Sequence, residues 1–305
     1  MIERENKHQE PIQQGMEYTA CCTLADLTHQ PTIEAQKIKN AKRGEILNTI
    51  FNEDCLITMS RIESGTVDLI LQDPPYGTTA NDWDKLPDLE TMWKEWNRII
   101  KPNGAIIMTA SQPFTTDLIM SNRKDFRYCL VWDKMRSCGS MLCNVMPLKY
   151  HEDIVVFYKE KPTYNPQMER GQRLKKASGG NSDNYGSIKI VREENDQYYP
   201  KSIISFKACH NMTGKFHPTE KPINLMRYLI RTYSNENETV FDGYAGSGST
   251  AHACILEKRN FICSELHEPY FKYAKQRIEN ERMQTKLFRK NRSGQGIFYF
   301  SSNYR

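Results

Sequence analysis

Residues 66–77, TVDLILQDPPYG, decide the fold class. The first half is a run of β-branched and aliphatic residues that predicts a buried strand, and Pro74 and Pro75 cannot continue it because proline donates no backbone hydrogen bond. The strand therefore stops at Asp73. The prolines also restrict the backbone, so we expect Asp73 and Tyr76 to be held rigidly at the carboxyl end of the strand, where open α/β sheets bind ligands.

Strand and helix patterns alternate on both sides of this stretch. Residues 46–59 predict a short strand that turns into a helix, and residues 89–104 predict an amphipathic helix closed by Pro102 and Gly104. This rhythm predicts an α/β fold with a doubly wound, mostly parallel sheet. Further strands are expected at 105–110, 127–134, 152–160 and 260–265, and a further helix at 222–234.

Length and composition limit the class of protein. The 305 residues can bury a full core, 26% of them are charged, and the formal net charge is +5, which permits a polyanionic partner without requiring one. No apolar run reaches the roughly 18 residues of a membrane span, and the first residues, MIERENKHQE, are polar, so we expect a cytoplasmic protein. The nine cysteines include no C-x-x-C pair, so neither disulfides nor a metal site are expected.

Composition and hydrophobic pattern predict four segments of the chain. Residues 1–45 are a polar N-terminal extension, 46–159 one half of the α/β domain, and 216–305 its other half. Between the halves, residues 160–215 interleave Lys and Arg with tyrosines. Such an insertion is either a surface loop or a nucleic-acid clamp, in which cations meet phosphates and rings meet bases.

A glycine loop marks the second half. Gly246 and Gly248 lie between the strand pattern VFD and a helix, so the backbone can turn sharply and approach a ligand. Glu265 ends the next strand, 19 residues after Gly246, as the ribose-binding acid of a dinucleotide site does. The pairing indicates a site for an adenosine-containing cofactor, either a nicotinamide dinucleotide or S-adenosylmethionine.

The two motifs together resemble the S-adenosylmethionine-dependent DNA amino-methyltransferases, which methylate N6 of adenine or N4 of cytosine. The resemblance covers residues 46–159 and 201–283. It rests on four segments: NEDC (52–55), DPPYG (73–77), HPTEKP (217–222) and FDGYAGSGST (241–250). Their order resembles the β class of the family, in which the cycle of βα units is circularly permuted and a target recognition region is inserted. Gly243 and Tyr244 depart from the proline and phenylalanine that are usual in the cofactor loop.

The resemblance implies a role for each matching residue. Asp73, Pro74, Pro75 and Tyr76 would form the catalytic motif, with Asp73 and the Pro74 carbonyl accepting the two amino hydrogens of a flipped-out base and Tyr76 stacking on its ring. A structural role is expected for the pair His151 and Glu152, since direct transfer needs no general acid. On the cofactor side, the roles fall to Asp54 (adenine), Glu265 (ribose), Gly246, Gly248 and Asp242 (methionine end) and Lys221, which would pair with the methionine carboxylate or cap a helix.

The resemblance implies a DNA adenine-N6 methyltransferase that acts on double-stranded DNA, because the aspartate form of the motif goes mainly with adenine. Methylation of cytosine N4 or of RNA adenosine is the nearest alternative. A nicotinamide-dependent oxidoreductase would leave DPPY without a purpose, and a non-catalytic DNA-binding protein would not need the intact motif. A homodimer and a cognate restriction endonuclease are further expected partners.

Overall fold

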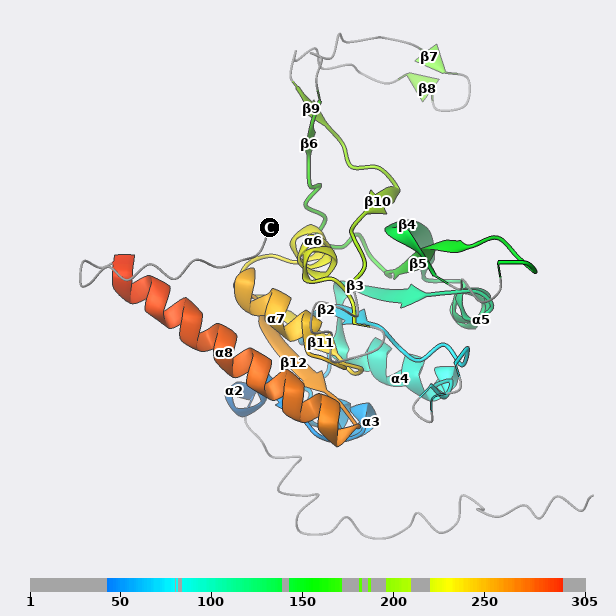
Figure 1. Cartoon of the computed structure of the whole chain (residues 1–305). Helices are drawn as coiled ribbons and strands as arrows, with labels where there is room; N and C mark the ends of the chain where they lie inside the picture. The colour runs from blue at the N-terminus through cyan, green and yellow to red at the C-terminus, as the bar shows by residue number, and fades with distance from the viewer. Residues whose placement is uncertain are drawn as a thin grey trace, which may run out of the picture. The chain divides into compact units, whose positions relative to one another are not determined.

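One mixed sheet of eight strands organises the protein, in the order β1-β12-β11-β2-β3-β5-β4-β10 (Figure 1). The computed structural model describes residues 43–79, 81, 84–138, 143–171, 181–182, 186–187, 196–209 and 220–292. The strands β1, β12, β11, β2 and β3 run parallel, β5 runs antiparallel to β3 and β4, and β10 runs parallel to β4. The strand bounds are β1 Thr49–Phe51, β2 Val67–Gln72, β3 Ile100–Ala110, β4 Phe126–Cys138, β5 Lys149–Phe157, β10 Ile203–Ser205, β11 Thr239–Asp242 and β12 Asn260–Ser264.

Helices cover both faces of this sheet (Figure 1). Side chains of α6, α7 and α8 pack on one face in a core that includes Leu69, Leu71 and Ile107. Side chains of α3, α4 and α5 pack on the other face around Ile70 and Met108. The helices are α2 Arg43–Ile46, α3 Cys55–Arg61, α4 Leu89–Ile99, α5 Phe114–Ser121, α6 Ile223–Tyr233, α7 Ser249–Leu256 and α8 Glu268–Arg292, and two short strand pairs are β6 Glu169–Arg170 with β9 Gln197–Tyr198 and β7 Asn181–Ser182 with β8 Gly186–Ser187.

The predicted α/β fold with a mostly parallel, doubly wound sheet is confirmed. The end of one helix was predicted too late: α4 stops at Ile99, and β3 begins at Ile100, which pairs with Val67. Pro102 explains the difference, because a proline disfavours helical backbone at the residue before it. The chain therefore leaves the helix before Pro102 and enters the sheet early, with a register shift between Val67 and Leu69.

The segment 160–215 is only partly separate from the sheet. Its residues Ile203–Ser205 form β10, which pairs with β4 in the central sheet, so this strand belongs to the fold that carries the site. The N-terminal extension up to residue 42 lies outside the described residues. Within the described part of the chain, no helix has the length and apolar character to cross a membrane.

Candidate active site

Four carboxylates lie at the carboxyl ends of four neighbouring parallel strands. Asp54 follows β1, Glu265 follows β12, Asp242 ends β11 and Asp73 follows β2. Because these strands are adjacent in the order β1-β12-β11-β2, residues that are far apart in sequence meet along one edge of the sheet. Ligands of open α/β sheets bind at this edge.

The carboxylate of Asp73 is held by one of its two oxygens. Oδ1 accepts hydrogen bonds from the Tyr76 hydroxyl at 2.8 Å and from the Thr109 hydroxyl, and it lies 2.6 Å from the Lys221 ammonium nitrogen. Among the described residues, none donates a hydrogen bond to Oδ2. The side chain is 21% exposed, so Oδ2 is available to a ligand in a carboxylate that cannot rotate freely.

The proline pair places the aromatic ring beside this carboxylate. Pro74 is buried, and the Tyr76 ring stacks on Phe114 with centroids 5.7 Å apart and an angle of 19° between the rings. Burial, together with the negative charges of Asp73 and Glu152, raises the pKa of Tyr76 well above its usual value. The hydroxyl is therefore a proton donor to Asp73 and not a phenolate.

Asp84 folds the loop after the motif. Its Oδ1 accepts the backbone N–H groups of Tyr76 and Gly77 at 2.8 and 2.9 Å, and its Oδ2 those of Thr78 and Thr79 at 3.0 and 2.7 Å. Burial alone would raise the pKa of Asp84, but the hydrogen bonds from this loop outweigh it and lower the pKa. An ionised carboxylate thus fixes the position of the loop, and the sequence offered no signal for it.

Lys221 lies in a buried ionic cluster with Asp73 and Glu152. It is 6% exposed, and its ammonium lies between the carboxylates of Asp73 and Glu152, at 2.6 and 3.4 Å. The expectation of an exposed helix-capping lysine is wrong, because the side chain is buried and Pro222 occupies the cap position of α6. Its expected contact with the cofactor carboxylate stays a prediction.

Glu152 belongs to the same ionic cluster. Its Oε1 lies 2.5 Å from the ammonium of Lys134, a buried residue of β4. Successive residues of a strand point to opposite faces, so the neighbouring His151 is exposed, whereas Glu152 points into the ionic cluster. The sequence did carry a signal here, since a glutamate in the apolar strand EDIVVF needs a partner when it is buried.

The glycine loop and Glu265 contact each other, and their roles toward a cofactor stay predictions. The Glu265 carboxylate accepts the Gly246 N–H at 2.7 Å through Oε2 and the His267 N–H at 2.8 Å through Oε1. Gly248 adopts a φ of 78°, and a Cβ there would lie 2.9 Å from Cβ of Ala274 in α8. Both the turn and the close packing therefore require glycine.

Asp242 is a buried carboxylate without a nearby cation among the described residues. Burial raises its pKa to about 7, although hydrogen bonds from Thr250 and the Tyr244 N–H oppose the shift. The charges of Asp73 and Glu265 add to it. A cation bound beside Asp242 would stabilise its ionised form, and the methionine end of S-adenosylmethionine carries a sulfonium and an ammonium.

Asp54, which follows β1, lies at the start of α3, and Gly243 and Tyr244 of the cofactor loop pack close to it. Asp54 caps α3 by accepting the Leu56 N–H at 2.8 Å, and its side chain is exposed, so the carboxylate is fixed and accessible to a ligand. A Cβ at Gly243 would lie 2.8 Å from Cβ of Cys55. Tyr244 packs against the core beside α3, so the departure from the usual residues is accommodated locally.

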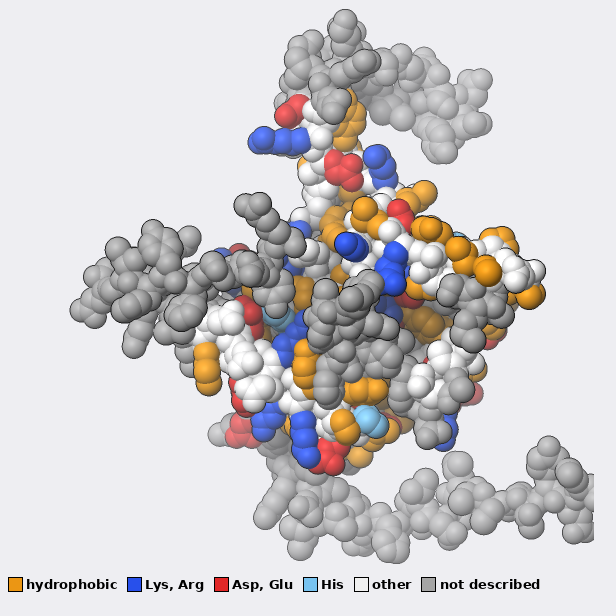
Figure 2. Space-filling view, in the orientation of Figure 1, with side chains coloured by type: hydrophobic (Ala, Val, Ile, Leu, Met, Phe, Trp, Pro, Cys, Tyr) orange, Lys and Arg blue, Asp and Glu red, His pale blue; other side chains and the backbone are white. Residues whose placement is uncertain are grey.

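A hairpin extends the sheet beside the site. The β4–β5 pair carries exposed apolar side chains, and Figure 2 shows hydrophobic atoms gathered over this part of the face with basic side chains among them. Lys149 of this hairpin donates a hydrogen bond to Ser111 at the carboxyl end of β3, which connects the hairpin to the edge that holds Asp73. The exposed residues include Met135, Val145, Met146, Leu148 and Tyr150.

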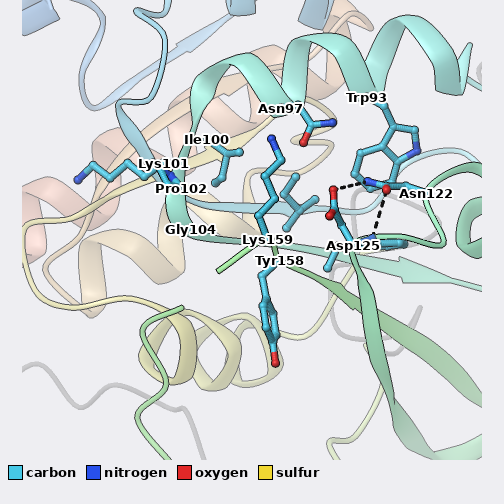
Figure 3. Close-up of a pocket in the computed structure, with 12 residues that line it drawn as sticks. Trp93, Asn97, Ile100, Lys101, Pro102, Gly104, Asn122, Asp125, Tyr158 and Lys159 are labelled. Carbon is cyan, nitrogen blue, oxygen red and sulfur yellow. Dashed lines mark hydrogen bonds between the residues drawn. The ribbon is translucent and has the colours of Figure 1, made fainter. Parts of the chain in front are cut away.

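A small pocket lies at the opposite edge of the sheet (Figure 3). It is lined by the start of β3, including Lys101 and Gly104, and by Trp93, Asn122 and Asp125. The start of β3 is the amino end of a parallel strand, so this pocket is separate from the row of carboxylates. Asn122 and Asp125 bond to each other there at 3.3 Å, and we assign the pocket no chemistry.

Comparisons with known proteins show the family to which the chain belongs. The family model described as DNA methylase matches residues 67–276, more than half of the chain. Type II methyltransferase M.HpaI of Haemophilus parainfluenzae is 26% identical over 238 residues (73% of this chain, 71% of that protein), and DNA adenine methyltransferase YhdJ of Escherichia coli K12 is 26% identical over 260 residues (77% and 84%).

Solved structures share the fold. The M1.HpyAVI–SAM complex has a TM-score of 0.52 at 22% identity and covers 75% of this chain and 98% of that one. The cytosine-N4-specific PvuII DNA methyltransferase has a TM-score of 0.56 at 15% identity and covers 81% and 93%. The family match decides between the two cofactor classes that the glycine loop left open, and the chain belongs to the N6/N4 DNA methylase family.

Proposed function

We propose that this chain is a site-specific methyltransferase that modifies N6 of a flipped-out adenine in double-stranded DNA. The observation that carries the proposal is the asymmetry of Asp73, whose Oδ1 is held by Tyr76, Thr109 and Lys221 while Oδ2 has no donor among the described residues. A carboxylate in this state is ready to accept a hydrogen bond from a substrate amine.

An amine conjugated to a purine ring is a poor nucleophile, because its lone pair is delocalised into the ring. Asp73 Oδ2 would accept one amino hydrogen and the Pro74 carbonyl the other, which favours a pyramidal nitrogen with a localised lone pair. Pro74 and Pro75 restrict the backbone that carries both acceptors, so they are oriented before the base arrives. Orientation and electrostatics therefore supply the catalysis.

The methyl donor is S-adenosylmethionine, whose sulfonium supplies the electrophilic methyl group. Glu265 and Asp54 would hold its adenosine at β12 and β1. Asp242, Gly246 and Gly248 would lie against its methionine end, and the buried charge of Asp242 gains a cationic partner there. With these contacts the donor would lie beside Asp73, because β11 is the neighbour of β2.

The target base cannot be reached inside a duplex, so it must leave the stack. Tyr76 is partly exposed beside Asp73, and stacking on its ring would return about 1–3 kcal/mol of the cost of flipping. The exposed apolar side chains of the β4–β5 hairpin, which Lys149 connects to the carboxyl end of β3, would contact the duplex. A homodimer and a partner endonuclease stay predictions.

Adenine is proposed over cytosine because the motif has the aspartate form and the relative YhdJ is described as an adenine methyltransferase. N4 of cytosine presents the same amine geometry to Asp73, so base choice depends on the pocket around the ring. Incubation with labelled S-adenosylmethionine and unmethylated genomic DNA, followed by digestion to nucleosides, tests both points.

We expect the label to appear in N6-methyladenine. The rate of label transfer should fall more than about 10²-fold in Asp73→Asn, because the amide keeps the shape of the side chain but is a weaker acceptor. Label in N4-methylcytosine would reject the base assignment. Label in DNA at the same rate from Asp73→Asn would reject the proposed chemistry.

A further inference from the structure

We propose that Lys221 is a positioning residue for the reaction: it holds Oδ1 of Asp73 and so leaves Oδ2 turned toward the substrate amine. This inference rests on the proposed function, because it assigns how the catalytic carboxylate is oriented. It differs from a role for Lys221 in binding the carboxylate of the cofactor. The two roles predict opposite effects on binding and on rate.

The contacts of Lys221 favour the positioning role. The ammonium lies 2.6 Å from Asp73 Oδ1, 3.4 Å from Glu152 Oε2, and 5.6 Å from the centre of the Tyr76 ring. These three partners surround a side chain that is only 6% exposed. The shortest of these contacts is the one to Asp73, so the ammonium is placed chiefly against that carboxylate.

Charge in the cluster is balanced through Lys134. Two carboxylates, Asp73 and Glu152, alternate with two ammonium groups, Lys221 and Lys134, in a chain that reaches from β2 to β4. Burial alone would lower the pKa of Lys221, but the two carboxylates outweigh it and raise the pKa. Likewise burial would raise the pKa of Glu152, but Lys221 and Lys134 outweigh it and lower the pKa.

The backbone before α6 is also anchored. Glu220, next to Lys221, pairs with Arg277 of α8 at 2.8 Å, and the same guanidinium donates to the carbonyl of Ser247 in the glycine loop at 3.2 Å. Arg277 therefore ties the segment that carries Lys221 to the cofactor loop. Contacts of its side chain and anchoring of its backbone segment both hold Lys221 in place.

The test compares Lys221→Met and Lys221→Arg in two measurements. We expect the single-turnover methylation rate of Lys221→Met, at saturating DNA and S-adenosylmethionine, to fall about 10²-fold, because the carboxylate loses its orientation. Lys221→Arg, which keeps a cation, should recover part of the rate. The Kd of S-adenosylhomocysteine, measured by calorimetry, should change by less than about threefold in both variants.

A double-mutant cycle with Asp73→Asn identifies the route of the effect. If Lys221 acts through Asp73, Lys221→Met should reduce the rate little further in the Asp73→Asn background. Independent, multiplicative losses would overturn the inference. So would a Kd for S-adenosylhomocysteine that rises tenfold or more with an unchanged saturated rate, which would make Lys221 a cofactor ligand.

Separate control variants test whether a loss of rate comes from misfolding or from failure of the proposed chemistry. Glu152→Gln removes one partner of Lys221 and keeps the shape of the side chain, so it should lower the saturated rate about tenfold even if Lys221→Met fails to fold. An unchanged rate in Glu152→Gln would contradict the inference. Lys272→Met, which changes an exposed lysine of α8, serves as the matched control. Full activity of Asp73→Asn would reject the proposed function itself, a result distinct from these.

Discussion

The two oxygens of Asp73 have different surroundings, and this difference decides what the residue can do. Three donors converge on Oδ1, from the same loop (Tyr76), the neighbouring strand (Thr109) and the segment before α6 (Lys221). Each donor restrains the side chain, so little rotational freedom is left to lose when a base binds. Two of the three donors, Thr109 and Lys221, lie outside the DPPY motif, so residues from other elements help to orient its carboxylate.

Asp242 shows the cost of a carboxylate without a cation. An aspartate in an unfolded chain titrates near about pH 3.9. Burial raises the pKa of Asp242 to about 7 in the folded protein. Between these values the folded protein binds a proton at Asp242 that the unfolded chain has lost, so the free energy of unfolding falls as pH rises from about 4 to about 7.

Asp242→Asn should remove this dependence. We expect the variant to gain stability relative to the parent protein as pH rises from about 4 to about 7, and the difference to stay constant above that range, because the amide does not titrate. Urea denaturation of the ligand-free proteins at a series of pH values measures it. A difference that does not change with pH across this range would show that Asp242 is already ionised.

At the scale of elements, the loop after the proline pair depends on one side chain from further along the chain. Asp84 accepts four successive backbone N–H groups, those of residues 76–79. No regular hydrogen-bond ladder serves these groups, so the carboxylate replaces one. The position of Tyr76 therefore depends on the charge of Asp84.

Asp84→Asn should weaken the loop, because an amide offers one acceptor oxygen where the carboxylate offers two. We expect the free energy of unfolding to fall by about 1.5–3 kcal/mol, the usual value of hydrogen bonds to a charged group, and the methylation rate to fall with it. Urea denaturation and the label-transfer assay measure the two effects. Asp88→Asn is the matched control, since asparagine caps α4 as well as aspartate does. Equal behaviour of the two variants would contradict the role of Asp84.

The elements differ in how far the sequence predicted them. The end of β2 was predicted correctly because Pro74 and Pro75 leave the chain no alternative. The end of α4 was placed too late: Pro102 disfavours helical backbone at Lys101, and the pairing of Ile100 with Val67 brings the residue before it into the sheet. The proline could be read from the sequence, whereas the pairing could not.

Across the whole molecule, the site exists because of the order of the strands. Motifs predicted Asp54, Asp73, Asp242 and Glu265 one at a time, and the order β1-β12-β11-β2 puts them in a row. The partner of Lys221 could not be predicted, since its contact with Asp73 joins residues that are distant in the sequence. Its HPTEKP motif indicated a functional position but carried no information about which carboxylate it meets.

The most direct test of the central claim is a structure of the protein with duplex DNA and S-adenosylhomocysteine. The account predicts an everted adenine whose N6 lies within about 3 Å of Asp73 Oδ2 and of the Pro74 carbonyl oxygen, the range of a hydrogen bond. Oδ1 should keep its bond to Lys221. An everted base with its amine bonded elsewhere, or bonded to Oδ1 after Lys221 has moved away, would contradict the account.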